Sequence, residues 1–225
     1  MKVKFKHIFP GKILQIHYFG TTENLKIWID CEVNQEKKWF IIDLKESSAL
    51  EIPNPFSKEQ IYNWLGCTDW KASFSLIIQG KNPKAESYVT IDLKTGTVFE
   101  KTNVFSFQSV ANTKTKSEFE IQNPTHYQES NPHFESFKEF FLKKFKIEIS
   151  KGIDYLDSTN KLIFSYYLYE NTWVNKLKVC NLSFETEWED CLDSNELIGH
   201  TTFQMVNQFL VYTKNKNELI ILENE

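Results

Sequence analysis

The carboxylates are the first residues of this chain that could do chemistry. Asp30, Glu32, Asp69, Glu86 and Asp154 could supply the pair of carboxyl groups, about 5–10 Å apart, that glycoside hydrolysis requires. Their spacing singles out no pair, because Asp30 and Glu32 share one side of a predicted strand, as residues on a solvated face also do. The sequence therefore favours binding over catalysis, and a glycoside hydrolase with Asp and Glu around a central axis is the alternative function.

Metal and cofactor chemistry has no sequence support. The five histidines include no pair at the i, i+2 or i, i+4 spacing of metal ligands, and the four cysteines include no C-x-x-C pair. The glycine-rich phosphate-binding motifs and the G-x-S-x-G nucleophile motif are absent from the sequence. We therefore expect no metal and no cofactor, and we expect the cysteines to be reduced structural thiols.

Two short segments carry the candidate ligand-binding residues. Trp64, Asp69 and Trp70 surround a predicted turn, where exposed rings could stack on a sugar or bury a partner's side chain. The alternative for these rings is a packing cluster at the edge of a sheet. His126 and Tyr127 stand in a polar segment, and their alternative is an ordinary surface loop. The partner predicted from these residues is another protein or a small polar ligand.

The composition of the chain indicates which classes of partner and which cellular location to expect. The chain has 26 lysines, no arginine and a net charge of -4, so it lacks the bidentate guanidinium groups that read nucleic acid. Apolar runs extend over only a few residues, so no membrane-spanning helix is expected. Lysines at every second position up to Lys6 are unlike a signal peptide. We expect no nucleic-acid or membrane partner and a cytoplasmic location.

Alternating apolar and polar residues dominate the chain and predict a mostly β fold. Similar strand segments recur along the chain, and each contains a polar residue at a matching place. These residues are Asp43, Asp92, Asn181 and Glu223. The intervals are 49, 89 and 42 residues, and the long one is about twice the spacing of propeller blades. The pattern predicts a single β-propeller-like domain over 1–225 with about five blade-like units, and an irregular β-sandwich plus helix is the alternative.

Two segments complete this prediction. The region after residue 199 supplies only three strands, so we expect the N-terminal strand 2–9 to join it and close the C-terminal sheet. Phenylalanines recur at helical spacing after Asn131 and Pro132, which predicts an amphipathic helix over about 132–146. The polar stretch 111–131 before it predicts a long loop.

The hairpin over 89–100 contains Asp92, Thr95 and Gly96 and resembles the D-x-x-T-G-x-x-x-W hairpin of quinoprotein-type propeller blades. Phe99 replaces the usual tryptophan, and Trp188 occupies the matching place in a later unit. This motif implies blade architecture and no bound quinone. More of the chain, at 64–66, 92–96, 124–127 and 165–167, is similar to an uncharacterised bacterial family of unknown function, which supplies no site residues.

Overall fold

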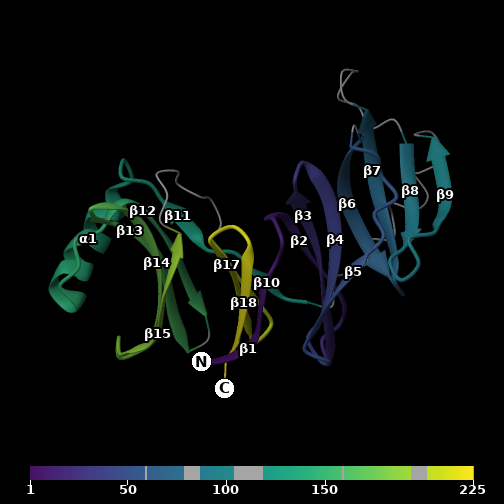
Figure 1. The fold of residues 1–225 in the computed structure, drawn as a ribbon. Coiled ribbons are helices and arrows are strands. Elements are labelled where there is room, and N and C mark those ends of the chain that lie inside the picture. Colours follow the sequence, from purple (N-terminus) through teal and green to yellow (C-terminus); the bar gives the residue numbers. More distant parts are fainter. Residues whose placement is uncertain (59, 79–86, 104–118, 159, 194–201, 225) are drawn as a thin grey trace. The chain divides into compact units, whose positions relative to one another are not determined.

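The computed structural model describes residues 1–58, 60–78, 87–103, 119–158, 160–193 and 202–224. This part of the chain is mostly β-strand with one α-helix, as the alternation predicts. It forms two compact units (Figure 1), of which the first contains Met1–Ile8 and Glu120–Glu225 and the second contains Phe9–Phe119. Glu86, which the sequence offered as a candidate carboxylate, and residues 111–118 of the predicted loop lie outside the described residues.

The described residues of the second unit form two four-stranded antiparallel sheets, and the strands of each sheet follow the order of the chain. The first sheet contains β2 (Lys12–Thr21), β3 (Asn24–Val33), β4 (Glu36–Asp43) and β5 (Ser48–Ile52). The second contains β6 (Gln60–Thr68), β7 (Lys71–Ile78), β8 (Ser87–Asp92) and β9 (Val98–Asn103).

One apolar core joins these two sheets. Trp28 and Trp39 from the first sheet and Tyr62 and Phe74 from the second are all almost fully buried within it. Alternate residues of each strand point to this core, as the pleat of a strand requires. A sheet of this size buries its apolar face only against another layer, so the face-to-face stack accounts for the aromatic-rich pattern of both sheets.

The first unit also contains two antiparallel sheets and the only helix of the described residues. One sheet contains β11 (Thr125–Tyr127), β12 (Ser150–Ser158), β13 (Lys161–Glu170), β14 (Thr172–Asn181) and β15 (Thr186–Asp193). The other contains β1 (Lys2–Ile8), β18 (Glu218–Glu223), β17 (Phe209–Lys214), β16 (Phe203–Val206) and β10 (Ile121–Gln122). The helix is α1 (Pro132–Phe145).

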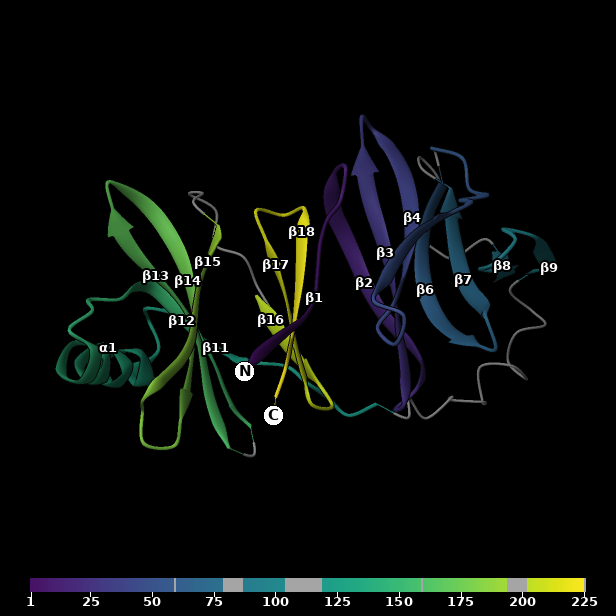
Figure 2. The ribbon, with the colours of Figure 1, turned by 60° about the horizontal axis from the view of Figure 1, so that its bottom comes forward.

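The N-terminal strand lies at the edge of the C-terminal sheet. β1 pairs antiparallel with β18, from Lys2 opposite Glu223 to Ile8 opposite Glu218, and Figure 2 shows the two chain ends beside each other. The C-terminal region supplies three strands of this meander, and β1 takes the fourth place. Met1 packs against the core of the unit, and its amino group lies 3.8 Å from the Glu187 carboxylate.

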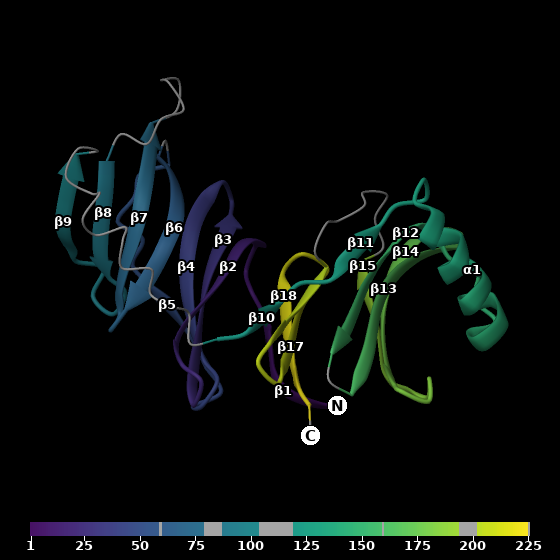
Figure 3. The same cartoon turned by 180° about the vertical axis from the view of Figure 1, so that it is seen from behind.

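The sheet of β11–β15 is covered on both faces. One face packs against the sheet of β16–β18 through a core that includes Ile163, Leu177 and Leu210. The other face packs against α1 through Phe134, Phe141 and the strand residues opposite them, and Figure 3 shows the helix on this side. Helix, sheet and sheet therefore form three layers within this unit.

The same chain of hydrogen bonds joins the stacked sheets in both units. In the second unit the Trp39 indole donates to the Tyr62 hydroxyl (2.8 Å), which donates to Asp30 (2.8 Å). In the first unit Trp188 donates to Tyr212 (3.1 Å), which donates to Asp190 (3.0 Å). In each case tryptophan and aspartate come from one sheet and tyrosine comes from the next. We call each of these hydrogen-bonded Trp-Tyr-Asp groups an inter-sheet clasp.

The described residues form four sheets, and the 89-residue interval contains α1 and the short strands β10 and β11. One sequence prediction needs correction. The predicted loop 111–131 contains β10 and β11, since Thr125, His126 and Tyr127 pair with β12. Short strands of this kind carry too few residues for their alternation to be visible in the sequence. The helix prediction is confirmed, with α1 ending one residue earlier than expected.

Candidate functional site

An aromatic groove lies between α1 and the sheet of β11–β15, wholly within the first unit. Its volume is about 450 Å³, which is in the range of small-molecule sites. Nine residues line it, from the helix, from three strands and from one turn. They are Tyr127, His133, Ser136, Phe137, Phe140, Tyr155, Leu162, Phe164 and Phe184. We call this feature the aromatic groove.

The helix supplies one wall. Asn131 caps α1, since its side chain accepts a hydrogen bond from the His133 amide (2.9 Å), and Pro132 occupies the first turn. Helical spacing then places His133, Phe137 and Phe140 along one side, three to four residues apart. Phe134 and Phe141 are buried against the sheet and fix the helix in place.

The strands supply the floor. Tyr155 on β12 and Phe164 on β13 are opposite each other in the ladder, and their rings stack with centroids 5.2 Å apart. Tyr127 on β11 lies two residues along the same face, because Thr125 is the partner of Tyr155. Phe137 of the helix contacts both tyrosine rings, at 5.1 Å from Tyr127 and 5.4 Å from Tyr155.

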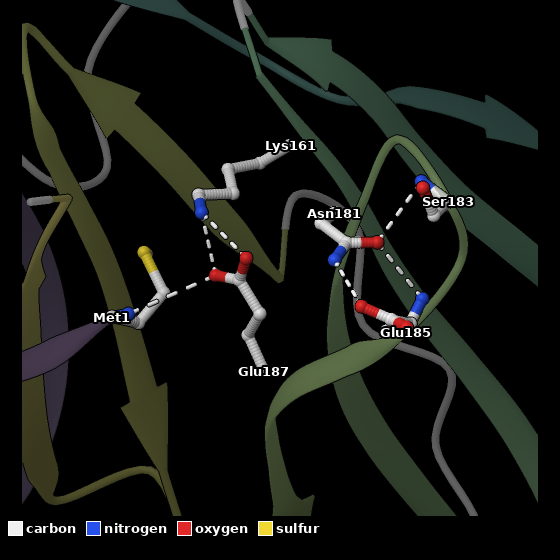
Figure 4. Close-up of polar contacts among 6 residues, drawn as sticks. All are labelled: Met1, Lys161, Asn181, Ser183, Glu185 and Glu187. Carbon is white, nitrogen blue, oxygen red and sulfur yellow. Dashed lines mark hydrogen bonds and ion pairs between the residues drawn. The ribbon is translucent and has the colours of Figure 1, made fainter.

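The turn between β14 and β15 closes one end of the groove. Asn181 holds this turn, since its side-chain oxygen accepts from the Ser183 amide (2.9 Å) and the Glu185 amide (3.0 Å), as Figure 4 shows. Its side-chain nitrogen donates to the Glu185 carboxylate (2.8 Å). The turn places Phe184 at a φ of 61°, which is uncommon for a bulky residue. This backbone conformation directs the Phe184 ring to Phe140, with centroids 5.0 Å apart.

The groove is mainly apolar, and its histidine, His133, is exposed at the rim. Tyr127, Phe137, Phe140, Tyr155 and Phe184 are half-buried, so their rings keep surface that could bury against a ligand. None of the nine lining residues in the described part of the chain is Asp, Glu or Lys. Burial, a nearby Asp157 carboxylate and Tyr127 together raise the pKa of the Tyr155 hydroxyl, so the phenol stays neutral at physiological pH.

His126, predicted with Tyr127 as a binding residue, belongs to a polar network beside the groove. Its Nδ1 lies 2.6 Å from the buried Asp154 carboxylate, which also accepts from the Thr202 hydroxyl at 2.8 Å. A Cβ on Gly152 would lie 3.3 Å from the His126 ring, so the strand passes close beneath it. A histidine oriented by an aspartate supplies two of the three groups of a catalytic triad, and here the Thr202 hydroxyl donates to the aspartate.

Trp64, Asp69 and Trp70 lie in the second unit and are therefore not part of the aromatic groove. Trp64 stacks on His17 at 5.2 Å, and both it and Trp70 pack against the core of that unit. The Lys26 and Lys94 ammonium groups lie over the Trp70 ring, at 5.2 and 4.9 Å. Asp69 is exposed at the turn before β7. Both rings thus contact residues of this chain, and their role in binding stays a prediction.

The candidate carboxylates do not gather at the groove. Asp30 is buried in one inter-sheet clasp and Asp154 holds His126, and the two belong to different units. Burial raises the Asp30 pKa to about 6, against the smaller opposing effect of the Tyr62 hydrogen bond. Among the described residues, no group of three or more His, Cys, Asp or Glu is arranged to hold a metal ion.

The cysteines have a structural character. All four are free thiols, and Cys31 and Cys180 are buried. Burial raises the pKa of the Cys31 and Cys67 thiols to about 12, which disfavours the thiolate that nucleophilic or redox chemistry requires.

The sequence found only part of this site. The sequence predicts Tyr127 as a binding residue, and the helical spacing of the phenylalanines after Asn131 places Phe137 and Phe140 on the predicted helix. Tyr155, Phe164 and Phe184 were missed, because each looks like an ordinary apolar position until β12, β13 and the β14–β15 turn lie beside α1. The available signal is the number of phenylalanines on α1: Phe134 and Phe141 are buried, whereas Phe137, Phe140 and Phe145 are only half-buried.

Comparison with known proteins adds no further constraint: neither the family models nor the curated proteins contain a match to this chain. In the part of the chain that the structure describes, no helix is both long and apolar enough to cross a membrane.

Proposed function

We propose that this chain is a non-catalytic binding protein and that the aromatic groove is its binding site. The observation that carries the proposal is a cavity of about 450 Å³ bordered by five half-buried aromatic rings. Aromatic rings stabilise a complex mainly through the apolar surface that they remove from water. A ligand that fills the groove would bury the part of these rings that is still exposed. The lining favours an apolar group over the small polar ligand that the sequence predicts.

The composition of the groove supports binding over catalysis. Glycoside hydrolysis needs two carboxylates at the substrate, and the described lining contributes none. His133 and Ser136 are exposed at the rim, and the groove is otherwise built from rings and one leucine. The proposal keeps the cytoplasm as the working location, which the four free thiols support.

We also propose that the four sheets are blade-like units related to those of quinoprotein-type propellers. Two observations support this: each sheet is essentially a sequential meander, and successive sheets stack face to face within each unit. The Asp92 side chain also accepts from the Lys94 and Thr95 amides at the hairpin that carries the resemblance. The helix α1 occupies the face of the β11–β15 sheet where a regular propeller would place another blade. The single domain over 1–225 and the bacterial family stay predictions.

The test of the function uses the neutral apolar dye N-phenyl-1-naphthylamine, whose fluorescence rises in an apolar site. We expect the full chain to bind the dye, and Phe140→Ala and Phe184→Ala to weaken binding about tenfold, because each removes a ring from the wall. Leu142→Ala is the matched control, since Leu142 lies on the same helix, is 56% exposed and does not line the groove.

Three results would contradict the proposal. They are failure of the dye to bind the folded wild-type chain, equal binding by the wild type and both phenylalanine variants, and turnover in a panel of glycoside and ester substrates. Circular dichroism of each variant separates loss of the groove from loss of the fold.

A further inference from the structure

We propose that the ligand of the aromatic groove is an uncharged, planar aromatic molecule that carries a hydroxyl group. This inference rests on the proposed function and adds the chemical class of the ligand. Three properties of the groove carry it: the absence of Asp, Glu and Lys from its described lining, the predominance of rings, and the presence of two tyrosines, Tyr127 and Tyr155.

The lack of charge selects a neutral ligand. A carboxylate, phosphate or ammonium group entering the groove would lose its hydration, and no lining Asp, Glu or Lys of the described residues would compensate for it. The Lys144 ammonium lies 5.7 Å from the centroid of the Phe184 ring. This ammonium lies against the ring at the end of the groove and is not part of the lining.

The rings select an aromatic ligand. Seven of the nine lining residues have aromatic rings, and Leu162 is the single aliphatic residue among them. Their mutual arrangement is already tilted or stacked, for example 54° between Phe137 and Tyr155 and 24° between Tyr155 and Phe164. An aromatic ligand gains edge-to-face and offset-stacked contacts with such walls beyond the area that it buries, whereas a saturated ring gains only the area.

The length of the wall indicates more than one ring. From His133 to Phe140 the helix rises by about 10 Å, which exceeds the span of a single benzene ring. Tyr127 lies at the end near His133, with ring centroids 6.1 Å apart, and Phe184 lies at the end near Phe140. Two fused rings would therefore contact both ends of the groove.

The tyrosines select a hydroxyl. In the described part of the chain, neither the Tyr127 nor the Tyr155 hydroxyl makes a side-chain hydrogen bond, although both rings are half-buried at the groove. Each phenol can donate one hydrogen bond and accept others, and a ligand hydroxyl has the same capacity. Neither hydroxyl oxygen is fully buried, so water can pair with it before a ligand binds. A hydroxylated ligand replaces that water, whereas a ligand that covers the oxygen without a hydroxyl leaves it unpaired.

The experiment titrates the full chain with 2-naphthol and follows amide and ring signals by NMR. We expect a dissociation constant of about 1 mM or tighter, as befits a ligand of this size. The charged analogue 2-naphthoate and the saturated analogue decahydro-2-naphthol should bind at least tenfold more weakly. Tyr127→Phe and Tyr155→Phe should each weaken 2-naphthol about fivefold and leave 2-methylnaphthalene unchanged, because they remove only a hydroxyl.

The control is Tyr169→Phe, since Tyr169 is 66% exposed and does not line the groove. Binding of 2-naphthoate or decahydro-2-naphthol as tight as that of 2-naphthol would overturn the inference, and so would insensitivity of 2-naphthol to both tyrosine variants. In these cases the dye experiment still upholds the groove as a binding site. If neither the dye nor any naphthalene probe binds, the proposed function fails as well.

Discussion

Asp30 is a buried carboxyl group in a network that serves packing. It accepts from Tyr62, and its second oxygen is buried with no hydrogen-bond partner among the described residues. Burial favours the neutral acid and raises the Asp30 pKa from 3.8 to about 6. The sequence marked Asp30 as a possible catalytic carboxylate, and a raised pKa is also what catalytic acids show. Its position in an inter-sheet clasp, away from the groove, explains the shift structurally.

This pKa shift predicts a pH dependence of stability. Between about pH 4 and pH 6 the folded chain binds more protons at Asp30 than the unfolded chain does, so this group's contribution to stability falls as the pH rises. Over that window the wild type should lose about 2 kcal/mol relative to Asp30→Asn, which does not titrate. Urea unfolding of both proteins at pH 4, 5.5 and 7 measures the difference. A difference that is constant with pH would refute the shift.

At the scale of elements, the inter-sheet clasps show why the stacked sheets stay in register. Trp188 and Asp190 stand on β15 and Tyr212 on β17, so one hydroxyl bonds both neighbours across the interface. The Lys214 ammonium also lies 2.5 Å from Asp190, which leaves this carboxylate paired on both oxygens. The same arrangement of Trp39, Tyr62 and Asp30 in the second unit indicates that face-to-face stacking is built into both units.

Tyr212→Phe tests the clasp with minimal change of shape. The variant leaves the Trp188 indole and one Asp190 oxygen without the hydroxyl, which should cost about 2 kcal/mol. For a chain of this length the melting temperature should fall by about 5 °C. Thermal unfolding followed by circular dichroism measures it, with the exposed Tyr169→Phe as the control. Equal melting temperatures for the two variants would show that the clasp contributes nothing.

The elements themselves were largely accessible from the sequence, because alternation and helical spacing are local. The capped helix after Asn131 is one example, and the hairpin at Asp92 is another. The short strand β11 could not be predicted from the sequence, since three residues show no periodicity and only their pairing with β12 defines them as a strand. The position of Phe184 could not be predicted either, because a turn normally places glycine or asparagine at a positive φ.

At the scale of the whole molecule, the sequence predicted more of the fold than of the site. Counting strands indicated that the C-terminal sheet lacked one, and β1 occupies that place. The interval of 89 residues contains α1 and the short strands β10 and β11, and spacing alone could not predict them. The groove combines segments from 127 to 184 that meet only after folding, so no local pattern could define it.

The most direct test of the central claim is to locate the bound dye by intermolecular NMR contacts. We predict nuclear Overhauser effects from N-phenyl-1-naphthylamine to the ring protons of Phe137, Phe140 and Phe184 in the aromatic groove. Contacts to Trp64 and Trp70 in their place, with none to the groove phenylalanines, would contradict the account.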